Sequence, residues 1–196
     1  MTSSTDPEAF RRGLFNLRTR RFGLVAELLI KRLINAQAAR SQFHDLYDDS
    51  QKHRIEVKFC TVNRESEEEI TLANLLQAIQ EAGEHRAVPF KDWKVYTFDA
   101  NIQQVKRSEF DVPYYGLFFS DAIVIFKMKS DRIKTSEEIL AAPSEGFINI
   151  KFSDKQHKGN KGEGQFHINN KTLEIHLSHF HYKTISYEDF LALLES

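Results

Sequence analysis

The stretch FHDLYDDSQKHRIEVKFC, residues 43–60, decides the fold of this chain. It has an apolar or aromatic segment at each end and a short polar segment, residues 49–53, in the middle. Two such segments joined by a short polar connection are typical of a β-hairpin. We therefore predict a short strand over residues 43–48 and a stronger one over residues 54–62.

The second of these strands alternates between apolar and charged residues. Ile55, Val57 and Phe59 are separated by Glu56 and Lys58. Successive side chains of a strand point to opposite faces, so residues two apart share a face. The pattern therefore places the three apolar side chains in a core and brings Glu56 and Lys58 together on the other face.

Helical and extended segments are both expected along the rest of the chain. An apolar stripe predicts a helix over residues 22–34, extended by residues 36–39, and Ser186 caps a closing helix that reaches Leu194. Between them we expect a helix over 71–84, strands over 93–98 and 147–152, two strands within 114–128, and a hairpin of 165–168 with 172–177. This order predicts an α/β (α+β) fold with a mixed central β-sheet flanked by helices.

The composition is that of a globular protein without cross-links. The chain has 196 residues, of which 41% are hydrophobic, so one domain over residues 1–196 can bury its own core. A single cysteine, Cys60, excludes an internal disulfide and a zinc site built from several cysteines. The first residues lack the features of a signal peptide, and no apolar run approaches the ~20 residues of a membrane span. We expect a cytoplasmic protein with no membrane partner.

Charge is unevenly distributed although the formal net charge is only −1. Residues 1–40 carry eight basic and three acidic side chains, and residues 151–183 carry six lysines and three acids. Residues 65–84 hold six glutamates and no lysine or arginine. Basic regions on either side of an acidic middle suit a protein that grips a polyanion at its ends. Ordinary solvated surface is the alternative.

The hairpin has an acid on each strand and a lysine two residues after the second acid. Asp45 opens the first strand, and pairing of the strands would bring it within one cation's reach of Glu56. Two close carboxylates repel and favour a hard divalent metal such as Mg²⁺, which binds oxygen ligands and keeps several waters. The Val57 carbonyl would add a third protein oxygen, and Lys58 would reach the same phosphate or the attacking water. This set suffices for phosphodiester hydrolysis, because the metal activates water and neutralises charge at phosphorus.

An acid two positions before a lysine is a weak signal by itself. With 28 acidic residues and 15 lysines in 196 positions, chance gives about two such triplets, and the sequence has two, at 56–58 and 92–94. Only the first lies mid-strand and follows an acid-headed strand, with Asp45 placed 11 residues before Glu56. An exposed strand face with an ordinary Glu and Lys is the alternative.

Asp45 followed by Glu56-Val57-Lys58 resembles the signature of the PD-(D/E)xK nuclease superfamily, and residues 54–58, RIEVK, are close to its commonest strand form. A helix before the hairpin and a leucine-rich helix after it are similar to the layout of type II restriction endonucleases. The close resemblance covers residues 43–60 and a looser one about 20–130. It implies a restriction-endonuclease-like fold and hydrolysis of double-stranded DNA at a specific short sequence. It also implies a Mg²⁺ cofactor, with Mn²⁺ able to substitute.

The resemblance has consequences for partners and one departure. One site per chain that cuts both strands of a palindrome implies a homodimer, and a restriction enzyme implies functional pairing with a DNA methyltransferase. His44 stands where the family has proline before its first acid, which leaves Asp48 and Asp49 as alternative ligands. Both lie nearer the turn, so we prefer Asp45.

Members of this family often add a helix carboxylate that supports the metal site. Glu27 is the only acid of the helix expected at 22–34, and it lies among apolar residues where an unpaired carboxylate is costly. We assign it to the catalytic set with Asp45, Glu56 and Lys58. Pairing of Glu27 with Lys31, four residues on, is the alternative.

Two regions are candidates for DNA contact. The first is the arginine-rich start of the N-terminal helix, and the second is a loop and hairpin at about 151–183, rich in lysine, glycine and residues with forked or ring side chains. Lysine and arginine suit phosphates, while amides and imidazoles suit base edges in a major groove. The candidates are Arg18, Arg20, Arg21, Lys155, Lys158, Lys161, Gln165, His167 and Asn169. A flexible surface hairpin is the alternative for the second region.

Two other functions remain open on the sequence. One is a repair or junction nuclease with the same site, which would cut branched or damaged DNA without sequence preference. The other is a non-catalytic DNA- or RNA-binding module in which the acids are surface groups.

Overall fold

The computed structural model describes residues 6–65, 69–80, 83–141, 150–153 and 163–195. The helices are α1 (Pro7–Phe15), α2 (Thr19–Ile34), α3 (Leu75–Gln80), α4 (Ser136–Ala141), α5 (Leu173–Phe180) and α6 (Tyr187–Glu195), with short 3₁₀ helices η1 (Gly83–Arg86), η2 (Phe90–Asp92) and η3 (Ser130–Arg132). The strands are β1 (Gln37–Ala38), β2 (Leu46–Asp48), β3 (His53–Thr61), β4 (Asp99–Val105), β5 (Val112–Phe118), β6 (Ile123–Lys127), β7 (Ile133–Thr135), β8 (Ile150–Phe152), β9 (Gly164–Asn169) and β10 (His181–Ile185).

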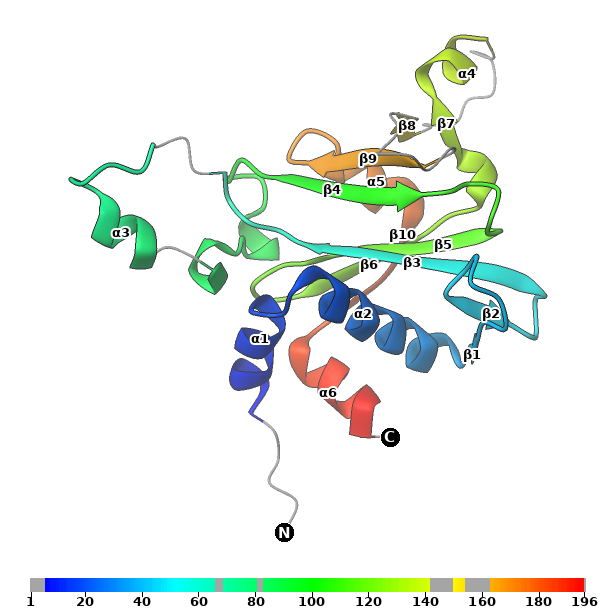
Figure 1. The fold of residues 1–196 in the computed structure, drawn as a ribbon, viewed down its shortest axis with the longest axis horizontal. Coiled ribbons are helices and arrows are strands. Elements are labelled where there is room, and N and C mark those ends of the chain that lie inside the picture. The colour runs from blue at the N-terminus through cyan, green and yellow to red at the C-terminus, as the bar shows by residue number, and fades with distance from the viewer. Residues whose placement is uncertain (1–5, 66–68, 81–82, 142–149, 154–162, 196) are drawn as a thin grey trace.

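A mixed six-stranded sheet lies at the centre, with the order β1-β2-β3-β5-β6-β10 (Figure 1). β3 and β5 run parallel, and the other neighbouring pairs of this sheet are antiparallel. β4 and β9 form an antiparallel ribbon, and β7 and β8 form a parallel one. The expected mixed central sheet flanked by helices is therefore present.

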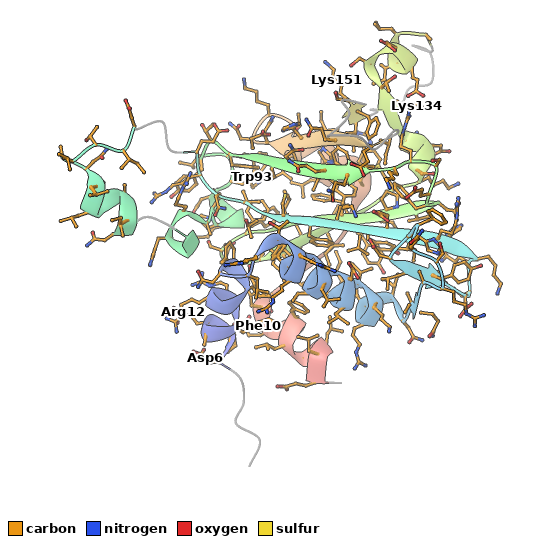
Figure 2. All side chains as sticks on the ribbon, in the orientation of Figure 1. Asp6, Phe10, Arg12, Trp93, Lys134 and Lys151 are labelled. Atoms are coloured by element: carbon orange, nitrogen blue, oxygen red, sulfur yellow. The ribbon has the colours of Figure 1, made fainter. Side chains whose placement is uncertain are left out.

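Two cores cover the two faces of this sheet. Ile55 and Val57 of β3 point into a core shared with α1, α2 and α6, which lie below the sheet in Figure 1. Tyr115 and Leu117 of β5 point into the opposite core, which the β4–β9 ribbon and α5 cover from above. Figure 2 shows side chains filling both layers. Each buried aliphatic or aromatic side chain contributes about 1.5–3 kcal/mol relative to exposure, so these layers hold the sheet in place.

The expected hairpin of β2 and β3 is confirmed, but β2 covers only residues 46–48 of the strand predicted over 43–48, so Asp45 lies just before it. Leu46 pairs with Ile55 and Tyr47 pairs with Arg54 in an antiparallel register. The ladder extends one residue beyond β2, because the backbone N–H of Asp45 donates to the Ile55 carbonyl at 3.0 Å. Leu46 and Ile55 share a core, so the register leaves Asp45 on the opposite face of the sheet.

Helix ends follow local sequence signals. Asp6, which lies at the start of α1 (Figure 2), caps this helix by accepting the backbone N–H groups of Glu8 and Ala9. Pro7 takes the first helical position. Ser186 caps α6 through the Asp189 N–H, as expected. Asn35 ends α2 in a left-handed conformation (φ 53°), so the predicted extension of this helix over 36–39 is wrong. Residues 37–38 form β1 instead.

The strand predicted over 93–98 is also wrong. The N–H groups of Asp92, Trp93 and Val95 bond back to carbonyls three residues earlier, which curls this segment into tight turns. The strand begins only at Asp99, as β4. The buried Trp93 side chain supplied an apolar signal that belongs to a turn and not to a strand.

The hairpin predicted within 151–183 is wrong in its second half. β9 pairs with β4 from earlier in the chain, and α5 follows it. Asn169 turns the chain, because its side-chain oxygen accepts the N–H groups of Lys171 and Thr172. Leu173 and His176, three residues apart, are buried together at helical spacing.

α3 is shorter than the predicted helix over 71–84 and projects away from the sheet (Figure 1). Leu72, Leu76 and Ile79 of this segment are exposed. Only the end of the predicted strand at 147–152 is described, as β8. Within the described residues, no helix combines the length and the apolar character needed to cross a membrane.

Gly116 of β5 provides a test of sheet packing. A Cβ at this position would lie 2.6 Å from the Val124 carbonyl oxygen of β6 and would also overlap the ring of Phe59. Because the carbonyl belongs to the sheet backbone, Gly116→Ala should lower the free energy of unfolding by roughly 1–3 kcal/mol. Chemical denaturation of the purified variant measures this.

Gly23→Ala is the matched control, because Gly23 lies inside α2 with no atom within 4 Å of the added Cβ. It should raise stability by roughly 0.5–1 kcal/mol, the helix-propensity gain of alanine over glycine. Equal stability of Gly116→Ala and the wild type would contradict the described packing of β3, β5 and β6.

Candidate active site

Three of the residues predicted to be catalytic meet on one face of the hairpin. The Lys58 ammonium contacts the Glu56 carboxylate directly and lies 3.9 Å from Oδ2 of Asp45. Asp45 and Glu56 therefore lie on the same face of the sheet and share one cationic neighbour, the Lys58 ammonium.

A hydrogen bond fixes Asp45 in this position. Its Oδ2 accepts the backbone N–H of Val57 at 2.8 Å. Asp45 is the residue just before β2, which begins at Leu46. A carboxylate that accepts a backbone N–H makes a charge-assisted hydrogen bond, about twice as strong as a neutral one. The Asp45 side chain therefore takes the place of a backbone carbonyl as the acceptor for this N–H of β3, at a point that β2 does not reach.

Glu27 of α2 belongs to the same electrostatic group. Burial raises the pKa of Glu27, the Asp45 carboxylate raises it further, and Lys58 lowers it. No ion pair between Glu27 and Lys31 occurs among the described residues, which removes support for the alternative reading of this helix position. Glu27 is therefore close enough to Asp45 and Lys58 to act on the charge of the site.

The electrostatics of the site are those of a partly buried group of charges. Burial raises the pKa of Glu56 to about 7, an effect that Lys58 partly offsets and Asp45 reinforces. Burial alone would lower the pKa of Lys58, but Glu56, Asp45 and Glu27 outweigh it, so this pKa is raised. At neutral pH Lys58 is a cation, while Glu56 is poised between its acid and its carboxylate.

The donor set fits a hard divalent metal. Asp45 and Glu56 supply two carboxylates, and a third oxygen is available from Val57, since the N–H and C=O of one strand residue leave the backbone on the same side. Mg²⁺ typically uses one or two carboxylates and retains several waters. No group of three or more His, Cys, Asp or Glu side chains in the described part of the chain converges as a metal site, so any ion here takes most of its ligands from water and substrate.

The alternative metal ligands have other surroundings. The Asp48 carboxylate accepts the N–H groups of Ser50 and Gln51 and the Ser50 hydroxyl, and this lowers the pKa of Asp48. Its side chain is therefore engaged in closing the hairpin turn. Asp49 is exposed beside it. The geometry favours Asp45 as the ligand.

Two further acids support the site and were not anticipated from the sequence. Asp111 lies just before β5. Its carboxylate accepts two hydrogen bonds of 2.8 and 3.2 Å from the Arg54 guanidinium and one of 2.8 Å from the Arg54 backbone N–H. This fixes the start of β3 beside β5. Glu109 adds a smaller contribution that raises the pKa of Glu56. Asp111 lies 57 residues from Arg54, so no local pattern connects these acids with the hairpin.

The predicted DNA-contacting arginines surround the start of α2. Arg18 is the residue before the helix, and Arg20 and Arg21 are in its first turn. All three side chains are exposed, and the first turn holds no acid. Cations at a helix N-terminus oppose the helix dipole, so this end of α2 is a favourable place for an anion.

The predicted contacts in the C-terminal region differ in their roles. Gln165 and His167 lie on β9, where they bond across the ribbon to Asn101 at 3.2 Å and to Asp99 at 2.7 Å. Asn169 is engaged in the turn before α5. Lys155, Lys158 and Lys161 lie outside the described residues.

Comparisons with protein-family models, with curated proteins and with solved structures found no match to this chain. Functional inference therefore depends on the residues of the site and their geometry.

The pKa of Glu56 predicts a pH dependence of metal binding. In metal-free protein, a proton and Mg²⁺ compete for this carboxylate, so Mg²⁺ affinity should fall as the pH drops below about 7 and level off above it. Well below pH 7, the loss should approach about tenfold per pH unit, because one proton is displaced per ion. Isothermal titration calorimetry between pH 5.5 and 8.5, on the order of one point per half unit, measures this dependence.

Asp48→Asn is the control, since its carboxylate belongs to the turn, and it should reproduce the wild-type profile. Asp45→Asn should weaken Mg²⁺ binding at every pH. An affinity independent of pH in the wild type would show that Glu56 is not a ligand.

Proposed function

We propose that the protein is a Mg²⁺-dependent endonuclease that hydrolyses double-stranded DNA at a specific short sequence, with a restriction-endonuclease-like fold. The observation that carries this is the convergence of Asp45, Glu56 and Lys58 on one face of the hairpin, with Glu27 beside them. A mixed sheet with α2 packed against β3 supplies the scaffold. Mn²⁺ should substitute, because it accepts the same oxygen ligands.

The protein side chains have separable roles in this proposal. Asp45, Glu56 and the Val57 carbonyl would hold the ion, which when bound supplies an activated water and a positive charge beside the scissile phosphate. Lys58, whose pKa the neighbouring carboxylates raise in the metal-free protein, would orient or deprotonate the attacking water or stabilise the developing oxyanion. Glu27 adds a negative charge that favours protonated Lys58, with a smaller effect on its pKa than Glu56 or Asp45.

Two groups of residues, one on α2 and one on β9 at the other side of the sheet, would contact the DNA. Arg18, Arg20 and Arg21 at the start of α2 suit phosphate groups, which also satisfy the positive end of the helix dipole. Gln165 and His167 on β9 offer an amide and an imidazole to base edges. The residues of the lysine-rich loop remain candidates on the sequence alone.

Cleavage of both strands of a palindrome calls for two copies of this site related by a two-fold axis, so we propose a homodimer on DNA. A restriction role further implies a companion DNA methyltransferase that protects the host sequence. We expect two protein chains per duplex when the protein is sedimented with an intact duplex that contains the cleavage sequence. Ca²⁺ replaces Mg²⁺ in this experiment to prevent cleavage. A monomer on that duplex would contradict the dimer.

The proposed chemistry is tested by digestion of unmodified phage DNA with Mg²⁺. The wild-type protein should give discrete fragments whose sequenced ends share one short motif. Lys58→Ala and Asp45→Ala should each lower the cleavage rate by at least about 100-fold, since each removes a group that acts on the transition state. Circular dichroism checks that both variants remain folded.

Lys94→Ala is the matched control, because Asp92-Trp93-Lys94 is the second acid-x-lysine triplet of the chain. Its ammonium makes a surface ion pair with Glu174 at 3.1 Å and should be dispensable for cleavage. Cleavage of branched DNA without a shared motif would favour a structure-selective nuclease. Full activity of Lys58→Ala, or DNA binding with no Mg²⁺-dependent cleavage, would overturn the proposal.

A further inference from the structure

A cavity of about 720 Å³ lies next to the candidate active site. It is lined by Lys31 of α2, by residues of β1 and the loop that follows, and by Tyr47 and Arg54 of the hairpin. Lys31 is one helical turn beyond Glu27, and Arg54 is two residues before Glu56 on the same face of β3. The volume falls within the range of about 300–1,000 Å³ that is usual for small-molecule sites.

Cations outnumber acids in the lining. Lys31, Arg40 and Arg54 contribute positive charges, and Asp49 is the only acid among the described lining residues. The Arg54 charge is matched by Asp111 at 2.8 Å. No ion pair joins Lys31 or Arg40 to an acid of the described chain, so the cavity keeps a net positive charge even with Asp49 counted. An anionic group is the ligand that such a charge favours.

Two ring side chains complete the lining. His44 and Tyr47 stand with ring centroids 6.5 Å apart. Nδ1 of His44 is buried and has no hydrogen-bond partner among the described residues, a condition that is unfavourable unless a ligand or water supplies the partner. A ligand that bears both an anionic group and a planar ring with polar edges would engage the cations, the tyrosine ring and this nitrogen together.

We propose that this cavity binds a nucleotide, with the phosphate against Lys31 and Arg40 and the base beside Tyr47 and His44. The same chemistry is offered by a free nucleotide and by a nucleotide unit at the end of, or turned out from, a DNA strand. The proposal depends on the cavity alone and does not require that Asp45, Glu56 and Lys58 form a nuclease site.

Isothermal titration calorimetry in EDTA tests it, since cleavage cannot occur without metal. The probes are deoxyadenosine monophosphate, deoxyadenosine and a short single-stranded oligonucleotide. The monophosphate should bind more tightly than the nucleoside, because only the monophosphate reaches the two cations. Lys31→Gln combined with Arg40→Gln should weaken the monophosphate by about tenfold or more and leave the nucleoside unchanged.

Arg32→Gln is the matched control. Lys31 and Arg32 are neighbours in the last turn of α2, but Arg32 is exposed and does not line the cavity. This variant should bind the monophosphate as the wild type does. Tyr47→Leu should weaken binding of the monophosphate and of the nucleoside alike, because it removes the ring that the adenine of either ligand would contact.

The arms also separate the two sources of the nucleotide. Equal affinity for the monophosphate and the oligonucleotide identifies a free nucleotide as the ligand, and much tighter binding of the oligonucleotide identifies a unit of a strand. Absence of binding for both the monophosphate and the oligonucleotide overturns the proposal. Equal losses in Arg32→Gln and in Lys31→Gln, each of which removes one positive charge, also overturn it, because the effect would then be one of overall charge.

Discussion

The hydrogen bond from the Val57 N–H to the Asp45 carboxylate is the contact on which the candidate site depends. Asp45 is the residue just before the short strand β2, so its side chain, and not the backbone of β2, pairs with β3 at this point. With Asp45 held there, the Lys58 ammonium lies against both Asp45 and Glu56. A shift of the hairpin register by one residue would move Asp45 to the opposite face and disperse the three charges.

The same constraint explains the cost that the site carries. Glu56 is buried beside another carboxylate, which is why its pKa rises to about 7 in the absence of metal. A chain selected only for stability would place an apolar side chain there, because a well-packed apolar residue avoids the desolvation of a charge. The ion pair of Arg54 with Asp111 fixes the start of β3, and the apolar face of β3 packs in the core shared with α2. These contacts offset the cost of burying Glu56.

The hairpin was predictable because its signals are local. Ile55, Val57 and Glu56 alternate within one strand, and five polar residues separate it from the strand before it. The closing helix, capped by Ser186, and the pair of strands within 114–128 were predictable for the same reason. The convergence of Asp45, Glu56 and Lys58 follows directly from that register.

Other elements depend on partners that are distant in sequence. β9 pairs with β4, and the two residues that bond across this pair, Asn101 and Gln165, are 64 residues apart in the sequence. The strand next to β9 is therefore not its neighbour along the chain. Trp93 is apolar and buried, yet hydrogen bonds back along the chain make its segment a turn. The contributions of Asp111 and Glu109 likewise arise only in three dimensions. The cationic cavity beside the site is of this kind too, because Lys31, Arg40 and Arg54 come from three separate elements of the chain.

The most direct measurement of the central claim is an anomalous diffraction map from crystals of the protein soaked in Mn²⁺. The account predicts one strong peak within coordination distance, about 2.0–2.4 Å, of an Asp45 oxygen, a Glu56 oxygen and the Val57 carbonyl, with Lys58 displaced from between the carboxylates. A peak elsewhere, or no peak in crystals that hold millimolar Mn²⁺, would contradict it.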